Sequence, residues 1–395
     1  MMALVGYACG GFHLDLCKAP NLFASCPLSF RKVAMKRIAL ALCFCVAPMF
    51  IAFCWSSATA RDLVKIDTCW IDESPGFNIW YAQKMGWDKE EGLDIVMHLF
   101  TSGPAQMEAL PAKQWVLGST GAGGQLTGII RYDAYSVAAT INEGINRLYL
   151  RPGHSATQIK GWNPEYPEVY GSPETVRGMK ILYTTQTTVH YMIGKWLEVL
   201  GLTFDDVTLV NMDQASAVAA FERNIGDAVG LWAPFVLTAE RKNWPLAGTG
   251  ETLKMPTVAS YVGDREWCDA HPDLVARFLR VHFRVAQMMR DEGLSPRIVE
   301  LHRQYMNEFC GIRMTAEESK RDLELHPRWT YDEALAVMVR QGGERSKAEQ
   351  WQDQIANFFA SIGRFSKEEI AKLQSGDNVT DKFLKRVELP ITALK

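Results

Sequence analysis

Residues 63–104 decide the fold of this 395-residue chain and read LVKIDTCWIDESPGFNIWYAQKMGWDKEEGLDIVMHLFTSGP. Apolar and polar residues alternate over 63–71, which predicts a strand, whereas 77–85 has the spacing of an apolar helix face and stops at Gly86. A second strand is predicted over 93–100. A strand, a helix and a strand joined by short turns favour a parallel sheet covered by helices on both faces.

The same alternation continues along most of the chain. Further strands are predicted over 114–118, 134–141, 179–183, 207–211 and 228–231, with helices between them. The segment 142–170 interrupts this rhythm with turn residues and prolines, and is interpreted as a surface excursion. An apolar stretch over 255–262 is expected to return to the first block, and the chain from His271 onward has the apolar spacing of helices.

We therefore expect an α/β protein with two similar lobes and a hinge between them. Lobe 1 is expected to comprise residues 61–141 and 255–395, including a C-terminal helical tail. Lobe 2 is expected to comprise residues 142–254.

The first sixty residues are expected to lie outside the folded protein. Lys36 and Arg37 precede an apolar run over 38–55, and Ala58-Thr59-Ala60 provides the small residues of a signal-peptidase site. These features predict a signal peptide over 35–60 that is cleaved after Ala60, and hence a periplasmic protein. One alternative is an uncleaved membrane anchor, because a run of about 18 residues is the lower limit for a membrane-spanning helix. A weaker alternative is a lipoprotein at Cys54, since Phe53 is too large for the usual position before a lipidated cysteine.

The signal begins at Met35 rather than at Met1. Residues 1–34 resemble neither a signal nor a domain. We therefore expect that translation starts at Met35, or that residues 1–34 are not structured.

Composition and motifs exclude several classes of function. The formal net charge of −3 argues against a nucleic-acid-binding protein, which usually carries a basic excess. Cys69, Cys268 and Cys310, the cysteines after residue 60, have no metal-site spacing and are interpreted as core residues that form at most one disulfide. The chain has no nucleophile elbow, no P-loop and no zinc-protease motif. We expect neither an enzyme nor a cofactor or metal site.

Candidate ligand-binding residues follow the predicted strands, since open parallel sheets bind ligands beyond the carboxyl ends of their strands. Most of these loops are rich in Ser, Thr and Gly and precede helices, whose free N–H groups suit an anion. The alternative is that these residues only cap helices. The candidates are Ser74, Gly76, Thr101, Ser102, Ser119, Thr120, Thr187, Thr188, His190, Asp213 and Trp232.

Three of the candidates have an alternative role. His190 faces the cleft or is a packed surface histidine. Trp232 stacks on a ligand or belongs to the core. Asp213 meets a cationic group on a ligand or caps a helix.

Several motifs together resemble the periplasmic binding proteins for nitrate, sulfonates and taurine, the NMT1/THI5-like family. The resemblance covers nearly all of 61–395 and is carried by 82–87 with 90–95, by 101–104, 118–121 and 172–180, and by 217–221, 227–228 and 232–235. It implies a type II periplasmic binding fold and a monomer that closes on a small organic anion and delivers it to an ABC permease in the membrane.

Several ligands are compatible with this resemblance. We expect an aliphatic sulfonate or taurine, with nitrate, bicarbonate, a thiamine precursor or an aromatic acid as alternatives. A periplasmic enzyme with His190 as its base and a ligand sensor for a membrane receptor are the rival functions. The branch of the family that makes the thiamine pyrimidine carries a cysteine-rich cluster, which this chain lacks.

Overall fold

The computed structural model describes residues 62–142 and 144–391. These residues belong to one compact unit. The predicted signal peptide over 35–60, its membrane-anchor and lipoprotein alternatives and the start at Met35 lie outside the described residues. Among the residues that are described, no helix is both long enough and apolar enough to span a membrane.

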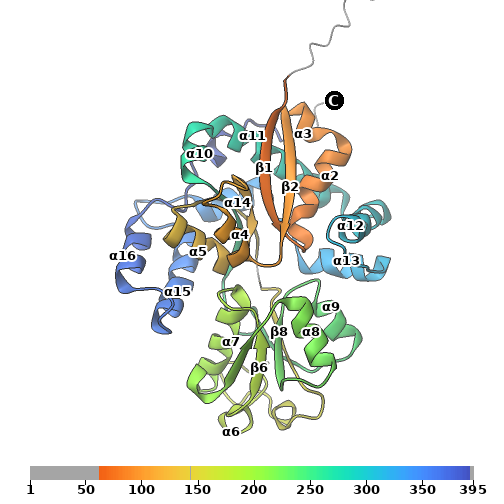
Figure 1. Ribbon diagram of the computed structural model, residues 1–395, viewed down its shortest axis with the longest axis vertical. Helices are drawn as coiled ribbons and strands as arrows, with labels where there is room; N and C mark the ends of the chain where they lie inside the picture. The colour runs from red at the N-terminus through yellow and green to blue at the C-terminus, as the bar shows by residue number, and fades with distance from the viewer. Residues whose placement is uncertain (1–61, 143, 392–395) are drawn as a thin grey trace, which may run out of the picture. The chain divides into compact units, whose positions relative to one another are not determined.

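The first sheet has the strand order β2-β1-β3-β10-β4 (Figure 1). Its strands are β1 (Val64–Ile71), β2 (Leu93–Phe100), β3 (Leu117–Thr120), β4 (Tyr135–Asn142) and β10 (Val258–Gly263). β1 runs parallel to β2 and β3, but β10 is antiparallel to β3 and β4. The expected return of 255–262 to this sheet is confirmed. The expectation of a purely parallel sheet is wrong, because β10 starts at Val258, opposite Asn142 where β4 ends, and runs back along β4.

The second sheet has the strand order β7-β6-β8-β5-β9. Its strands are β5 (Arg147–Leu150), β6 (Lys180–Tyr183), β7 (Thr208–Asn211), β8 (Ala228–Leu231) and β9 (Leu246–Thr249). β5 lies inside the sheet, antiparallel to β8 and β9, so interpreting all of 142–170 as a surface excursion is wrong. Leu148, Tyr149 and Leu150 are all buried, so the four-residue β5 shows no alternation between two faces.

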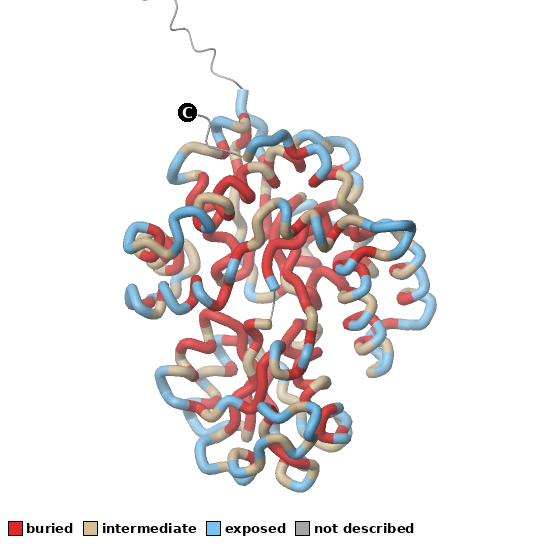
Figure 2. The backbone as a smooth tube through the Cα atoms, turned by 180° about the vertical axis from the view of Figure 1, so that it is seen from behind, coloured by how far each residue is buried: buried red, intermediate tan, exposed pale blue. Residues whose placement is uncertain are grey.

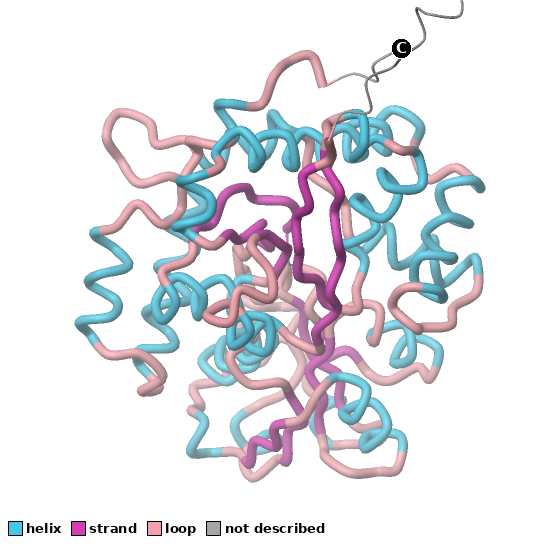
Figure 3. Tube along the Cα trace, turned by 45° about the horizontal axis from the view of Figure 1, so that its top comes forward, coloured by secondary structure: helices cyan, strands magenta, loops and turns pink. Residues whose placement is uncertain are grey.

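The helices between the strands follow the sequence pattern closely. They are α2 (Phe77–Met85), α3 (Trp87–Glu90), α4 (Gly103–Ala109), α5 (Ala122–Tyr132), α6 (Pro173–Val176), α7 (Thr188–Val199), α8 (Gln214–Glu222) and α9 (Val236–Arg241). α2 ends at Gly86, whose φ of 73° is the left-handed conformation that glycine adopts without strain. Figure 3 shows the strands running through the middle of the molecule with helices beside them, and Figure 2 shows that the buried backbone is concentrated there.

The C-terminal tail is helical from α10 onward. Its helices are α10 (Arg265–Ala270), α11 (Pro272–Glu292), α12 (Pro296–Glu308), α13 (Ala316–Leu325), α14 (Tyr331–Met338), α15 (Lys347–Ser361) and α16 (Lys367–Ser375). Capping boxes begin α13, α14, α15 and α16, each pairing a Ser or Thr with a Glu three residues later. The tail packs on both sheets' helices, since α15 contacts α5 and α7 and α13 contacts α9.

Cys69 and Cys268 are buried free thiols, and Cys310 is a partly buried free thiol. Burial raises the pKa of all three thiols. They therefore behave as core residues within the described part of the chain.

Candidate functional site

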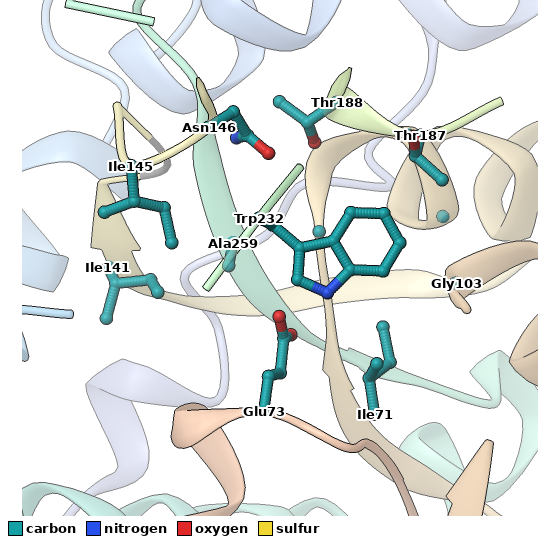
Figure 4. Close-up of a pocket in the computed structure, with 13 residues that line it drawn as sticks. Ile71, Glu73, Gly103, Ile141, Ile145, Asn146, Thr187, Thr188, Trp232 and Ala259 are labelled. Carbon is teal, nitrogen blue, oxygen red and sulfur yellow. The ribbon is translucent and has the colours of Figure 1, made fainter. Parts of the chain in front are cut away.

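A cavity lies where the carboxyl ends of strands from both sheets meet (Figure 4). Ile71 ends β1, Gly121 follows β3, and Trp232 follows β8. The space between the atoms is about 470 Å³, part of it open to solvent. The lining residues are Ile71, Glu73, Gly103, Gly121, Gly123, Gly124, Ile141, Ile145, Asn146, Thr187, Thr188, Trp232 and Ala259.

Glycines let the backbones around the cavity approach one another closely. A Cβ on Gly124 would lie 2.8 Å from the Cα of Gly103, so the beginnings of α4 and α5 touch. A Cβ on Gly123 would lie 2.4 Å from the carbonyl oxygen of Gln186 and 2.7 Å from the Cα of Thr187. The first turn of α5 is therefore pressed against the loop before α7, which belongs to the second sheet.

The first turns of α5 and α7 form one side of the cavity. Gly121 is the N-cap of α5 and Thr187 is the N-cap of α7. The Thr187 hydroxyl donates to the carbonyl of Thr184 at 2.7 Å, which fixes this loop. A helix N-terminus carries partial positive charge, so both ends favour a negatively charged group between them.

Glu73 lies on the opposite side of the cavity. Its backbone carbonyl accepts a hydrogen bond from the Tyr305 hydroxyl at 2.9 Å, and Arg328 Nη2 donates to the carbonyl of Ser74 at 2.7 Å. Tyr305 and Arg328 are buried, so the turn after β1 is held by the tail helices. Figure 4 shows the carboxylate of Glu73 directed into the cavity towards Trp232.

Trp232 forms the wall that belongs to the second sheet. Its backbone N–H donates to Gln214 Oε1 at 3.1 Å, and Gln214 Nε2 donates to the hydroxyl of Thr184 at 3.1 Å. The residue is only 7% exposed, and its indole Nε1 has no hydrogen-bond partner among the described residues. In Figure 4 this nitrogen lies on the side of the ring that faces Glu73 and Ile71.

The charge of the region is acidic rather than basic. Within the described residues, no lysine or arginine lines the cavity. Next to Glu73, burial raises the pKa of Asp72 to about 6, and the charge of Asp213 at the start of α8 contributes to this rise. The pKa of Asp213 itself is lowered by the backbone N–H of Ser216. A simple inorganic anion would find no positive side chain here.

The structure places only some of the predicted binding residues at the cavity. Thr187, Thr188 and Trp232 line it. Ser102 caps α4 by accepting from the Ala105 N–H at 3.4 Å, and Asp213 caps α8 by accepting from the Ser216 N–H at 2.8 Å.

The other predicted loop residues lie outside the cavity wall. Thr101 is exposed, whereas Ser119 and Thr120 are buried at the end of β3. Ser74 is buried and bonds to His302 and Arg328, and Gly76 is buried against the hydroxyl of Tyr305.

His190 does not face the cavity. Its ring is buried against Tyr183, Phe204 and Phe359, and its Nδ1 accepts from the Gln186 N–H at 3.2 Å. Burial lowers the pKa of His190 to about 3, helped by the charge of Arg364. A buried imidazole with that pKa and no path to the cavity is unsuited to act as a general base.

Ser74, His302 and Asp322 meet in an arrangement that superficially resembles a catalytic triad. His302 Nε2 lies 2.9 Å from Ser74 Oγ and 3.2 Å from Asp322 Oδ2, so the serine and the carboxylate share one ring nitrogen. All three side chains are buried. A triad needs the carboxylate on the other nitrogen and an accessible nucleophile, so this cluster supports the turn that carries Glu73.

Sequence reasoning missed Glu73 and the apolar wall of the cavity. The apolar wall consists of Ile71, Ile141, Ile145 and Ala259, with Asn146 beside them. Glu73 begins the turn 73–76, in which only Ser74 and Gly76 were predicted to bind the ligand. Residues 145 and 146 lie in the segment interpreted as a surface excursion. The acidic pair Asp72-Glu73 between an apolar strand and a turn is the one signal that could have identified Glu73.

Comparison with known proteins gives consistent matches. The model of the NMT1-like family matches residues 65–301. A protein of Brachyspira hyodysenteriae, named as a periplasmic binding protein of an ABC transporter, is 25% identical over 248 residues, which span 62% of this chain and 70% of that protein. The taurine-binding periplasmic protein of Escherichia coli is 24% identical over 196 residues, which span 49% of this chain and 56% of that protein.

The structural comparison bears on the fold. The alkanesulfonate-binding protein of Xanthomonas axonopodis pv. citri, solved bound to MOPS, matches with a TM-score of 0.60 at 16% identity, covering 80% of this chain and 99% of that chain. This likeness confirms the expected two-lobed α/β fold of a type II periplasmic binding protein with a helical tail. The relatives are named as binding proteins, which confirms the expectation of a binding protein rather than an enzyme.

Proposed function

The chain belongs to the NMT1-like family, and on that premise we propose that it is the extracytoplasmic solute-binding subunit of an ABC transporter. The observation that carries this proposal is the cavity between the two sheets, which is lined from both sides by loops at the carboxyl ends of strands. Such a site binds a solute when the two halves close on it, and no covalent chemistry is required.

We propose that each sheet and its helices form one lobe, with lobe 1 over 61–141 and 255–395 and lobe 2 over 142–254. The chain leaves the first sheet after β4 and returns in β10, so two segments cross between the sheets. Few crossing segments allow a hinge motion, in which a solute shifts an existing equilibrium between open and closed forms.

The proposed solute is a small organic anion, an aliphatic sulfonate or taurine. The N-termini of α5 and α7 carry partial positive charge, and the indole N–H of Trp232 is a donor without a partner among the described residues, so an anion is favoured without a basic side chain. The apolar wall of isoleucines suits a short aliphatic body. The similarity to the taurine-binding protein of Escherichia coli supports the same class of solute.

The proposed export of the protein and its membrane partner follow from the family. The relatives are periplasmic binding proteins, which places the function outside the cytoplasm. We propose export through the signal over 35–60 with cleavage after Ala60, a monomeric mature protein, and an ABC permease as its membrane partner.

A thermal-shift screen of the mature chain tests this function. The solutes are taurine, ethanesulfonate, nitrate, bicarbonate, a thiamine-precursor pyrimidine and an aromatic acid. A solute at 100 times its Kd should stabilise the fold by about 2.7 kcal/mol and raise Tm by several degrees. Recovery of unchanged solute by mass spectrometry would exclude turnover. A shift with none of the sulfonates would contradict the proposed solute and leave the fold standing.

A further inference from the structure

We propose that Gln214 is a positioning residue for the solute, which holds the two parts of the cavity wall contributed by the second sheet in a fixed arrangement. These parts are Trp232, which follows β8, and the loop 184–188 that leads into α7. The inference rests on the proposed function and goes beyond it, because Gln214 does not line the cavity and acts only through residues that do.

The side chain of Gln214 connects both parts of this wall. It lies in the first turn of α8 and is only 2% exposed. Its Oε1 accepts from the backbone N–H of Trp232 at 3.1 Å, and its Nε2 donates to Thr184 Oγ1 at 3.1 Å and to the carbonyl of Gly230 at 3.3 Å. The carbonyl of Thr184 accepts from the hydroxyl of Thr187 at 2.7 Å. One buried amide therefore links Trp232 to Thr187, and both of these residues line the cavity.

The partners of Gln214 fix the direction in which its amide points. A backbone N–H can only donate and a carbonyl can only accept, so Oε1 faces Trp232 and Nε2 faces Gly230. The hydroxyl of Thr184 donates to the carbonyl of Met212 at 2.8 Å and therefore offers only lone pairs to Nε2. The position thus requires one acceptor and one donor, and an ionised carboxylate of the same shape supplies no donor.

The first sheet has a glutamine in the equivalent place, and the comparison shows what distinguishes Gln214. The orders β2-β1-β3 and β7-β6-β8 are the same, so Gln106 on α4 corresponds to Gln214 on α8. Gln106 Nε2 donates to the carbonyl of Ser119, the third residue of β3, as Gln214 does to Gly230, the third residue of β8. Gln106 Oε1, however, is buried without a hydrogen-bond partner in the described part of the chain. Holding the end of a strand therefore does not require the further bonds that Gln214 makes.

These further bonds bear on the affinity for the solute. A wall that is already ordered lowers the free-energy cost of binding, because no side chain or loop has to be fixed when the lobes close. Gln214 bonds to the backbone of Trp232 and so restricts where the indole N–H of this residue can lie. Through Thr184 it restricts Thr187, the N-cap of α7, in the same way.

Gln214→Glu tests the inference, because protonation of the new carboxyl group restores the missing donor. Burial raises the pKa of a carboxyl group, so this group should titrate between about pH 6 and pH 8. We expect the variant to bind ethanesulfonate and taurine at least about tenfold more weakly than the natural protein at pH 8, and within about threefold of it at pH 5.5. Isothermal titration of the mature proteins measures this ratio of affinities, which removes the effect of Asp72 and Asp213 because both proteins carry them.

Gln106→Glu is the matched control. It places the same carboxyl group in the equivalent buried position of the first sheet, opposite the carbonyl of Ser119, and should be destabilised more at pH 8 than at pH 5.5. Its affinity for both probes should stay within about threefold of the natural value at pH 8, because the side-chain bond of Gln106 reaches no residue that lines the cavity.

Thr184→Val is a second variant, which removes the acceptor of Gln214 Nε2 without burying a charge. It should weaken the binding of both probes about fivefold, whereas Thr184→Ser keeps the hydroxyl and should bind them as the natural protein does. Circular dichroism at each pH establishes that every variant is folded.

The outcomes separate the two proposals. If the affinity of Gln214→Glu relative to the natural protein is the same at both pH values, or if folded Gln106→Glu loses as much affinity, the inference is overturned and the proposed function stands. If Gln214→Glu does not fold at pH 8, natural affinity in Thr184→Val overturns the inference, and a fivefold loss that Thr184→Ser restores supports it. If no sulfonate binds to folded natural protein, the proposed solute fails and the inference fails with it.

Discussion

Gly123 shows how a single residue permits the two sheets to come together. It lies in the first turn of α5, where a Cβ would lie 2.4 Å from the carbonyl oxygen of Gln186 and 2.7 Å from the Cα of Thr187. Both neighbours are backbone atoms of the loop before α7, and they cannot rotate away as a side chain can. Any larger residue at 123 must separate α5 from that loop.

Gly123→Ala should therefore hold the cavity open. We expect taurine, or whichever solute stabilises the natural protein, to bind at least about tenfold more weakly, because closure must displace backbone. Stability without solute should not fall, since alanine is favoured over glycine in a helix by about 1 kcal/mol. Titration calorimetry measures the binding, and small-angle X-ray scattering of the solute-bound form measures the closure.

Gly128→Ala is the matched control in the same helix. A Cβ there would meet Met107 Sδ at 2.5 Å, the flexible end of a side chain in the same lobe. The affinity of Gly128→Ala for the solute should stay close to that of the natural protein. If Gly123→Ala bound the solute as tightly as the natural protein does, the contact between residue 123 and the loop before α7 would not limit closure.

At the scale of the element, two helices of the tail hold the second sheet. α15 contacts both α5 and α7: Gln352 Nε2 donates to Gln125 Oε1 at 2.6 Å, and Phe358 packs on Tyr191 with ring centroids 5.0 Å apart. On α13, Arg321 forms an ion pair with Glu240 of α9 at 3.0 Å. α15 uses aromatic packing for this contact, whereas α13 uses exposed charges.

Phe358→Ala should lower the free energy of unfolding by about 2 kcal/mol. Truncating a fully buried phenylalanine costs about 3–5 kcal/mol, and Phe358 is only partly buried. Urea denaturation at pH 7.5 measures the change. Arg321→Ala provides the comparison. It should lower the free energy of unfolding by less than about 1 kcal/mol, because surface ion pairs contribute little to stability. A loss below about 0.5 kcal/mol for Phe358→Ala would show that α15 does not stabilise α7.

At the scale of the whole molecule, buried histidines make stability depend on pH. Burial lowers the pKa of His190 and of His282 to about 3 and that of His326 to about 4. The unfolded chain titrates these groups near 6.5, so it binds more protons than the folded protein at mildly acidic pH. Their contribution to stability is therefore present above about pH 6.5 and is lost as the pH falls towards their folded values.

The free energy of unfolding should be about 3 kcal/mol lower at pH 5.5 than at pH 7.5. Each of the three histidines contributes a loss of about 1.4 kcal/mol over this range. Asp72, whose pKa is raised to about 6, acts in the opposite direction and offsets about 1 kcal/mol. Urea denaturation at both pH values tests this, and His190→Phe should reduce the difference by about 1.4 kcal/mol. Equal stability at both pH values would contradict the prediction.

Elements whose signals are local could be predicted from the amino-acid sequence alone. β2, α2 and β8 were predicted with the bounds that the structure has, because strand and helix periodicities and the stop at Gly86 lie within each segment. The role of Asp213 as a cap was among the predicted alternatives for the same reason. Local propensity and capping involve neighbours only a few residues apart, so one chain is enough to recognise them.

Tertiary contacts set the direction of β10, the place of β5 inside its sheet and the walls of the cavity. β5 is too short and too fully buried to show a period, and the direction of β10 follows from where the chain re-enters the first sheet. The ring of His190 packs against Phe358 and Phe359 instead of facing the cavity. The turn that carries Glu73 is held at the cavity by hydrogen bonds from Tyr305 and Arg328. The positions of His190 and Glu73 depend on packing between residues more than 150 apart in the chain, which no local pattern encodes.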